Sequence, residues 1–110
     1  MIRVLLDENL PRRLKWSLDS TIVAEAITVP ERGWSGVKNG ALLALAAAEF
    51  DVLLSMDRGL PHQQNLWDVD LCLILLGAVS NALDDLLPLV PDLNVALTQM
   101  APGRILRVAL

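Results

Sequence analysis

Two short apolar segments that each stop on a carboxylate constrain the fold of this chain more than any other feature. Residues 4–6 (VLL) are followed by Asp7 and Glu8, and residues 52–56 (VLLSM) are followed by Asp57. Continuous apolar runs this short are typical of strands buried on both faces of a parallel sheet. Ligands bind such sheets beyond the carboxyl ends of the strands. We therefore expect Asp7 and Asp57 to face one crevice, as a cradle for a divalent cation.

The rest of the chain alternates further apolar runs with helical patterns, which predicts an α/β fold with a mostly parallel sheet. The chain has 110 residues, a length that suits one domain with one core. We expect a single domain over residues 1–110, in which helices flank a five-stranded sheet. The expected strands are residues 2–6, 22–29, 52–56, 71–76 and 105–108.

A helix is expected directly after the first strand. Leu10, Leu14 and Leu18 are spaced four residues apart, so they fall on one helical face. Asn9 or Leu10 would cap this helix, with Pro11 in its first turn, where a missing N–H costs nothing. The amino-terminal dipole of such a helix would favour the charged forms of the carboxylates that precede it.

Two further helical regions are expected. Asn39 is a good amino-terminal cap for a helix over residues 40–49, which is nearly all Ala and Leu and would pack on two sides. Residues 80–100 form the last region, and Pro88 and Pro91 would divide it into a short first turn and a longer helix. Residues 63–65 (QQN) are expected to begin a helical turn or to contact RNA.

The composition favours a protein that buries part of its surface against a partner. Hydrophobic residues make up 54% of the chain, yet the longest apolar stretch, residues 71–79, is about half of the ~20 residues that a membrane helix needs. We therefore expect no membrane span and a homo-oligomer or a partner chain. Cys72 is the single cysteine and is expected to be a buried thiol, which indicates a cytoplasmic location.

The charges are distributed unevenly, although the net charge is −4. Six of the nine basic residues follow the first three expected strands, which would surround an acidic centre with a basic rim. That arrangement suits a metal-dependent enzyme that cleaves phosphodiesters, because the rim holds phosphates and the centre holds the ion. Ordinary solvated charges explain the same pattern equally well. The rim consists of Arg12, Arg13, Lys15, Arg32, Lys38 and Arg58.

Four motifs in order resemble the short PIN-like proteins, relatives of the PIN-domain toxin ribonucleases. They cover nearly the whole chain. The resemblance implies a PIN-like α/β/α sandwich, RNA cleavage that depends on Mg²⁺ or Mn²⁺, and a role as the toxin of a toxin–antitoxin pair. The motifs are residues 5–11 (LLDENLP), 33–40 (GWSGVKNG), 56–61 (MDRGLP) with 63–65 (QQN), and 80–81 (SN) with 84–88 (DDLLP).

The resemblance assigns roles to several acidic residues. Asp7 matches the first catalytic acid of the family, and Asp57 matches the late one. Relatives often carry an acid two residues after the expected helix cap, but this chain has Ala41 there. Glu8 or Glu31 would then supply a third metal-binding carboxylate, since Mg²⁺ needs carboxylates and ordered waters in near-octahedral geometry.

Phosphate binding is expected from the basic residues near these acids. Arg12 and Arg58 are the candidate phosphate anchors, with Lys38 on the rim and His62 as a candidate substrate contact. A surface role explains His62 as well. Likewise, Asp7 could simply cap the helix after it.

Two other functional classes remain open. A non-catalytic interaction module would keep the fold and its apolar interface but lack the middle acid. A response-regulator receiver also places an acidic pair after its first strand, an Asp after its third and a hydroxyl after its fourth, a pattern that Ser80 completes. A receiver needs a Lys at the end of its last strand, where this chain has Arg104 and Arg107. Asp57 could also be a turn-forming residue before Gly59.

Overall fold

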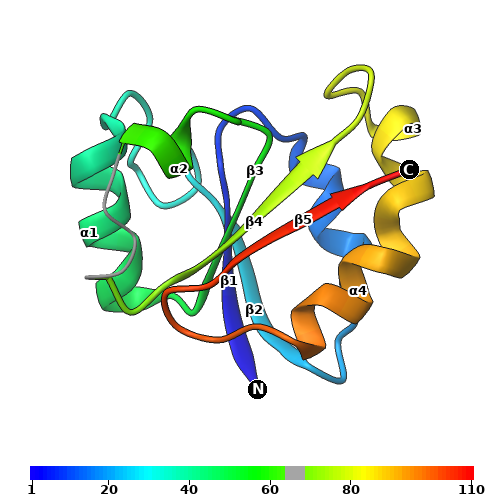
Figure 1. The fold of residues 1–110 in the computed structure, drawn as a ribbon, viewed down its shortest axis with the longest axis horizontal. Helices are drawn as coiled ribbons and strands as arrows, with labels where there is room; N and C mark the ends of the chain where they lie inside the picture. The colour runs from blue at the N-terminus through cyan, green and yellow to red at the C-terminus, as the bar shows by residue number, and fades with distance from the viewer. Residues whose placement is uncertain (64–68) are drawn as a thin grey trace.

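The computed structural model describes residues 1–63 and 69–110, and in this part of the chain five strands form one all-parallel sheet (Figure 1). The order across the sheet is β2-β1-β3-β4-β5. The predicted α/β class, strand number and parallel arrangement are therefore confirmed. The strands are β1 (Ile2–Leu6), β2 (Val23–Thr28), β3 (Val52–Ser55), β4 (Cys72–Gly77) and β5 (Ile105–Ala109).

The strand order creates a switch point between β1 and β3. The chain leaves β1 to form β2 on one side, and then crosses to β3 on the other side of β1. In open parallel sheets, ligands bind outside the carboxyl ends of the strands at such a point. Leu6 of β1 pairs with Leu54 of β3, so the residues that follow these strands emerge side by side at the switch point.

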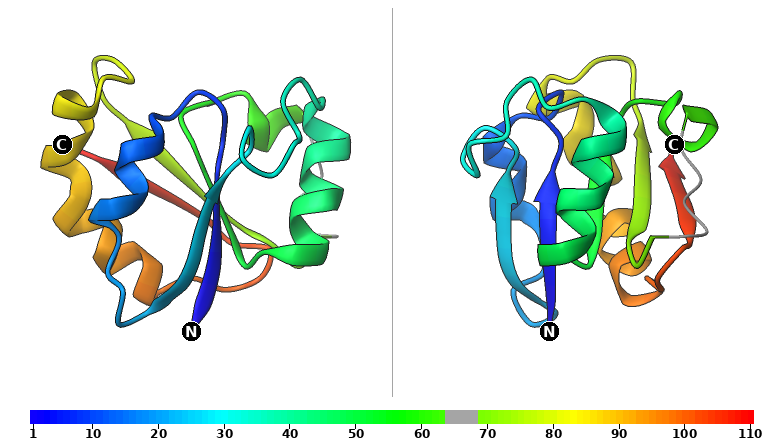
Figure 2. Two further views of the ribbon diagram at one scale, coloured as in Figure 1. Left: turned by 180° about the vertical axis from the view of Figure 1, so that it is seen from behind. Right: turned by 90° about the vertical axis from the view of Figure 1, so that its left-hand side faces the viewer.

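Helices cover both faces of the sheet, as Figure 2 shows. On one face lie α1 (Asn39–Glu49) and α2 (Leu60–Gln63). On the other face lie the 3₁₀ helix η1 (Arg12–Ser17), α3 (Leu83–Leu86), the 3₁₀ helix η3 (Leu87–Leu89) and α4 (Val90–Thr98). The sandwich therefore has three layers, as predicted.

Alternate residues of each strand supply two separate cores. Along β3, Leu53 packs with the α1 side, whereas Val52 and Leu54 pack with the η1 and α4 side. Cys72 is buried in the second of these cores, as expected. Because both faces are covered, the central strands have no polar face, which explains their unbroken apolar sequence.

The first helix differs from the prediction. Residues 12–17 form a 3₁₀ helix, and Pro11 is its amino-terminal cap and makes no side-chain capping bond. Leu18 is extended and ends the helix after six residues. Leu10, Leu14 and Leu18 are nevertheless all buried in one core, so the apolar face was identified correctly. The predicted α-helix dipole behind the first acids is absent, because no α-helix forms in residues 12–17.

Other element ends are also corrected. The cap of α1 is Lys38 with no side-chain capping bond, and Asn39 is the first helical residue instead. β3 ends at Ser55, one residue early, because the Met56 amide donates to the Asn9 side chain. The last helical region divides as predicted, although α4 ends at Thr98. The residues 64 and 65 of the expected QQN turn lie outside the described residues.

Candidate functional site

Asp7 is fixed at the switch point by its own backbone and by two hydrogen bonds to its carboxylate. Its amide donates to the Leu54 carbonyl at 2.9 Å, which extends the β1–β3 pairing by one residue. The Ser55 hydroxyl donates to Oδ2 at 2.7 Å, and the Glu8 amide donates to Oδ1 at 2.8 Å. The side chain is therefore buried and oriented, with 7% of the residue exposed.

Asp57 lies beside it on the turn after β3. The Asp57 amide donates to the Ser55 hydroxyl at 3.0 Å, and its Oδ1 accepts from the Gly59 amide at 2.9 Å. Asp57 thus forms the turn before Gly59, as one alternative held, and it also belongs to the same hydrogen-bonded group as Asp7. The Ser55 hydroxyl links the Asp7 carboxylate to the Asp57 backbone, a role that its place inside an apolar run did not reveal.

Two asparagines complete this group, although sequence analysis treated both as helix caps. Asn9 Nδ2 donates to the Ser55 hydroxyl at 3.3 Å, and Asn9 Oδ1 accepts from the Met56 amide at 3.4 Å. Asn39 Nδ2 donates to Asp57 Oδ2 at 3.5 Å. The two amides hold the ends of β3 and α1 around the acids. A signal was present, since each asparagine stands within a motif of the resemblance.

The electrostatics of Asp7 are opposite to the expectation. Burial raises the pKa of Asp7 above 3.8, and the charges of Glu8 and Asp57 raise it further, against the hydrogen bonds from Ser55 and the Glu8 amide. The helix dipole that was expected to favour its charged form is missing. Asp57 makes the smallest of these contributions, so burial and not the second carboxylate accounts for most of the rise in the pKa of Asp7.

The raised pKa predicts that charged Asp7 costs stability at neutral pH. A carboxyl group whose folded-state pKa is raised loses stabilisation as pH rises from its unfolded value of 3.8 through the higher folded value. Asp7→Asn stays neutral, so it should melt at a higher temperature than wild type at about pH 7 and show no such gain at about pH 3. Circular dichroism melts across this range measure the difference. Asp92→Asn on exposed α4 should show none, and equal melting of Asp7→Asn and wild type at neutral pH would contradict the prediction.

The two candidates for a third carboxylate are both engaged elsewhere. Glu31 accepts from Lys15 at 2.8 Å and from Arg12 at 3.1 Å, and chiefly the Lys15 ammonium lowers its pKa to about 2. The Glu8 carboxylate is directed at the Gly36 amide, at 3.3 Å and 3.4 Å from its two oxygens. Among residues 1–63 and 69–110, no three acidic, His or Cys side chains form a group that could hold a metal ion.

The basic rim is partly neutralised. Arg12 and Lys15 are paired with Glu31, and Arg32 is paired with Glu49 at 2.8 Å. Arg58 is exposed and, with His62, lines a cavity beside β4 and β5. Lys38, at the amino end of α1, is also exposed. Of the candidate substrate contacts, the structure therefore brings Arg58 and His62 together and leaves Arg12 in an ion pair.

Trp34 is a loop anchor rather than a free stacking surface. It is 9% exposed, and its ring meets Phe50 edge to face at 6.1 Å between centroids. The Arg32 guanidinium lies over the Trp34 ring, 4.6 Å from its centroid. The Gly-Trp-Ser-Gly loop is thereby pinned to the α1 side of the sheet, where the Gly36 amide meets Glu8.

A scan against protein-family models finds no match, and searches of curated proteins and of solved structures find none either. The resemblance to short PIN-like proteins therefore rests on the sequence motifs alone. No helix in the described part of the chain is long and apolar enough to cross a membrane.

Proposed function

We propose that this protein is a metal-dependent ribonuclease that cleaves single-stranded RNA, as the toxin of a toxin–antitoxin pair. The observation that carries the proposal is that the Ser55 hydroxyl joins the Asp7 carboxylate to the backbone amide of Asp57 at the β1–β3 switch point. Function depends on the site rather than on the fold. This site presents two carboxylates to the edge where ligands bind in such sheets.

The donor set fits Mg²⁺ or Mn²⁺. Both ions prefer oxygen ligands, and Mg²⁺ is commonly held by one or two carboxylates with waters and substrate phosphates. Asp7 and Asp57 would hold the ion, and the Asn39 side chain, at the first turn of α1, donates to Asp57 from Nδ2. A cation held by these residues would supply positive charge to the phosphoryl oxygens of a phosphodiester that water attacks in line.

The protein's own residues position the reacting groups. Ser55 and the Glu8 amide fix the orientation of the Asp7 carboxylate, and the Gly59 amide fixes that of Asp57. Arg58 follows Asp57 directly, so its guanidinium can hold a phosphate next to the acid pair. Preorganised groups of this kind lower the barrier because they need no rearrangement during the reaction.

The proposal is tested by RNA cleavage and by metal affinity in an Ala41→Glu variant. Glu31 is bound by the Lys15 ammonium, so it does not supply a third acid to the site. The first turn of α1 is close to Asp57, because Asn39 donates to the Asp57 carboxylate. Ala41→Glu should tighten Mn²⁺ binding about tenfold in calorimetry and increase cleavage of single-stranded RNA in Mn²⁺. Ala44→Glu, exposed on the same helix, is the matched control and should change neither. Wild type and Ala41→Glu that are both inert in Mg²⁺ and Mn²⁺ would refute the proposal.

The proposed partner is an antitoxin-like chain or a second copy. The side of α1 that faces away from the sheet carries Ala44, Leu45 and Ala48, all exposed, while Leu42 and Leu43 pack on the sheet. Apolar exposed surface of this kind is typical of protein contacts. This helix is therefore the surface on which the partner is expected to bind.

A non-catalytic interaction module is the second candidate. The observation that favours it is the engagement of Glu31 by Arg12 and Lys15, which leaves two acids where PIN nucleases use more. The same cleavage assay separates the two functions. An inert wild type that still binds a partner chain through α1 would favour the module.

A receiver is favoured only by the strand order, since response-regulator receivers share the order 2-1-3-4-5. The Ser80 hydroxyl donates to Asp85 and accepts from the Ala82 amide, so it is engaged in the turn before α3. Arg107 stands where a receiver needs Lys. A stable beryllofluoride adduct on Asp57 would support the receiver.

A further inference from the structure

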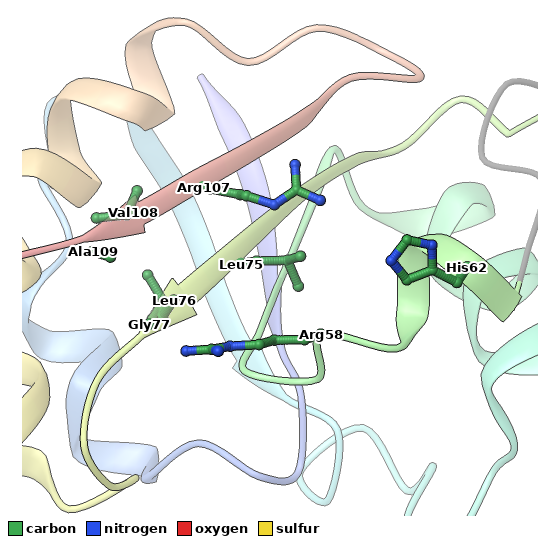
Figure 3. Close-up of a pocket in the computed structure, with 8 residues that line it drawn as sticks. All are labelled: Arg58, His62, Leu75, Leu76, Gly77, Arg107, Val108 and Ala109. Carbon is green, nitrogen blue, oxygen red and sulfur yellow. The ribbon is translucent and has the colours of Figure 1, made fainter.

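A cavity of about 340 Å³ lies at the carboxyl ends of β4 and β5 (Figure 3). Its volume is at the lower end of the range of small-ligand pockets. Leu75 forms an apolar floor on the α1 side of the sheet and is nearly fully buried, whereas the side chains of Leu76 and Val108 belong to the core on the opposite face. Among the described residues, the polar side chains around this floor are those of Arg58, His62 and Arg107. The cavity is therefore small, apolar beneath and cationic around its edge.

Each of the three basic side chains is directed to the cavity by a local feature. Arg107 of β5 pairs with Leu75 of β4, so the two side chains lie on the same face of the sheet. Arg58 follows the Asp57 turn and extends toward Gly77, where a Cβ would lie 3.8 Å from its guanidinium. His62 is on α2, and Figure 3 shows it facing Leu75 from the side opposite β5.

Within residues 1–63 and 69–110, no acid balances the charge of the cavity. No carboxylate of this part of the chain lines the cavity, and none forms an ion pair with Arg58, His62 or Arg107. Asp84 and Asp85 line a separate cavity on the other side of Arg58, and Asp85 accepts from Ser80. Arg58 and Arg107 are both exposed and have no acidic partner among the described residues, so their guanidinium groups are available to an anion in the cavity.

We propose that Arg58, His62 and Arg107 form a binding pocket for a phosphate monoester, such as the terminal phosphate of an RNA strand or of a free nucleotide. Two permanently charged guanidinium groups match the double negative charge of a monoester, and each can donate two parallel hydrogen bonds to its oxygens. A phosphodiester within a strand carries a single charge and is matched less well. The apolar floor suits the nucleoside attached to the phosphate.

The assignment of an RNA terminal phosphate as the ligand rests on the proposed function, in which RNA is the substrate. Binding of a phosphate monoester by the pocket does not itself require cleavage. The pocket adds Arg107 to the candidate phosphate-binding residues. From the sequence, Arg107 had been notable only because it lies in the strand where a receiver carries a Lys. Arg58 joins the two sites, since it lines the pocket and directly follows Asp57. An RNA end held here would place a nearby phosphodiester next to the acid pair.

Calorimetry in EDTA with adenosine 5′-monophosphate tests the pocket. Arg107→Gln and Arg58→Gln should each weaken binding at least about tenfold, because each removes charge-assisted hydrogen bonds. Arg104→Gln is the matched control, since Arg104 is an exposed arginine at the other end of β5 whose guanidinium donates to the Gln99 carbonyl. It should bind as wild type does. Wild-type protein that binds no monophosphate, or equal affinities of Arg107→Gln and Arg104→Gln, would overturn the proposal.

Two further arms identify the source of the phosphate. A short RNA with a 5′-phosphate should bind more tightly than the same RNA with a 5′-hydroxyl. If adenosine 5′-monophosphate binds as tightly as the phosphorylated RNA, the ligand is a free nucleotide. Equal binding of the two RNAs that is lost in Arg107→Gln would overturn the monoester and indicate the strand's internal phosphates. Asp57→Asn should bind the monophosphate normally. Binding without any cleavage by wild type would refute the nuclease and leave the pocket intact.

Discussion

Asp57→Asn is expected to reduce metal-dependent RNA cleavage about 100-fold or more while the protein stays folded. The substitution removes a charged ligand of the proposed metal site, and losses of this size are typical when groups that hold or stabilise transition-state charge are removed. Asparagine keeps an oxygen for the Gly59 amide, so the turn after β3 should persist. Initial rates of single-stranded RNA cleavage in Mg²⁺ and in Mn²⁺ measure the loss, and melting curves check the fold.

Two variants make this test specific. Asp7→Asn should lose activity to a similar degree, because it removes the other carboxylate yet keeps an oxygen for the Glu8 amide. Asp92→Asn removes the same charge from exposed α4 and should cleave as wild type does. Cleavage that survives in both Asp7→Asn and Asp57→Asn would exclude the acid pair as the catalytic centre.

Leu54→Ala is expected to lower the free energy of unfolding by about 3–5 kcal/mol. Leu54 has no exposed surface, and it lies on the central strand β3 between Leu6 of β1 and Ile74 of β4. Truncation removes buried methyl groups and leaves a cavity that the neighbouring strands of the sheet cannot close. Since domains of this size are stabilised by only about 5–15 kcal/mol, the variant should be marginally stable.

Chemical denaturation of Leu54→Ala, with Leu45→Ala as the control, checks this prediction. Leu45 is on α1 and is 39% exposed, so the same truncation there should cost less than about 1 kcal/mol. The two variants differ by position and not by chemistry. Similar denaturation midpoints would contradict the buried central strand that the fold requires.

The burial of Asp7 links the proposed activity of the protein to its stability. The carboxylate is placed where its charge is costly, and Ser55 and the Glu8 amide offset part of that cost. Substitution by asparagine should therefore remove activity and raise stability at neutral pH together. Such opposite effects are common where a functional group is held in an unfavourable environment.

The fold could be predicted from local pattern because the three central strands, β1, β3 and β4, are buried on both faces. That burial requires continuous apolar runs at residues such as Val4 to Leu6 and Leu71 to Leu76, and those runs mark the strands directly. The turn at Asp57 before Gly59 is equally local, since the Asp side chain bonds the amide two residues on. The end of β3 and the caps of η1 and α1 were missed because Asn9 and Asn39 bond to distant segments.

The sequence by itself determined the α/β class, the parallel strands and the placement of Asp7 and Asp57 at strand ends, since these follow from hydrophobic pattern along the chain. Only the tertiary structure decided which charges meet. Glu31 accepts from Lys15, sixteen residues away, and Arg107 lines the same cavity as Arg58. Such contacts depend on strand order and register, which bring together side chains whose separation along the chain carries no periodic signal.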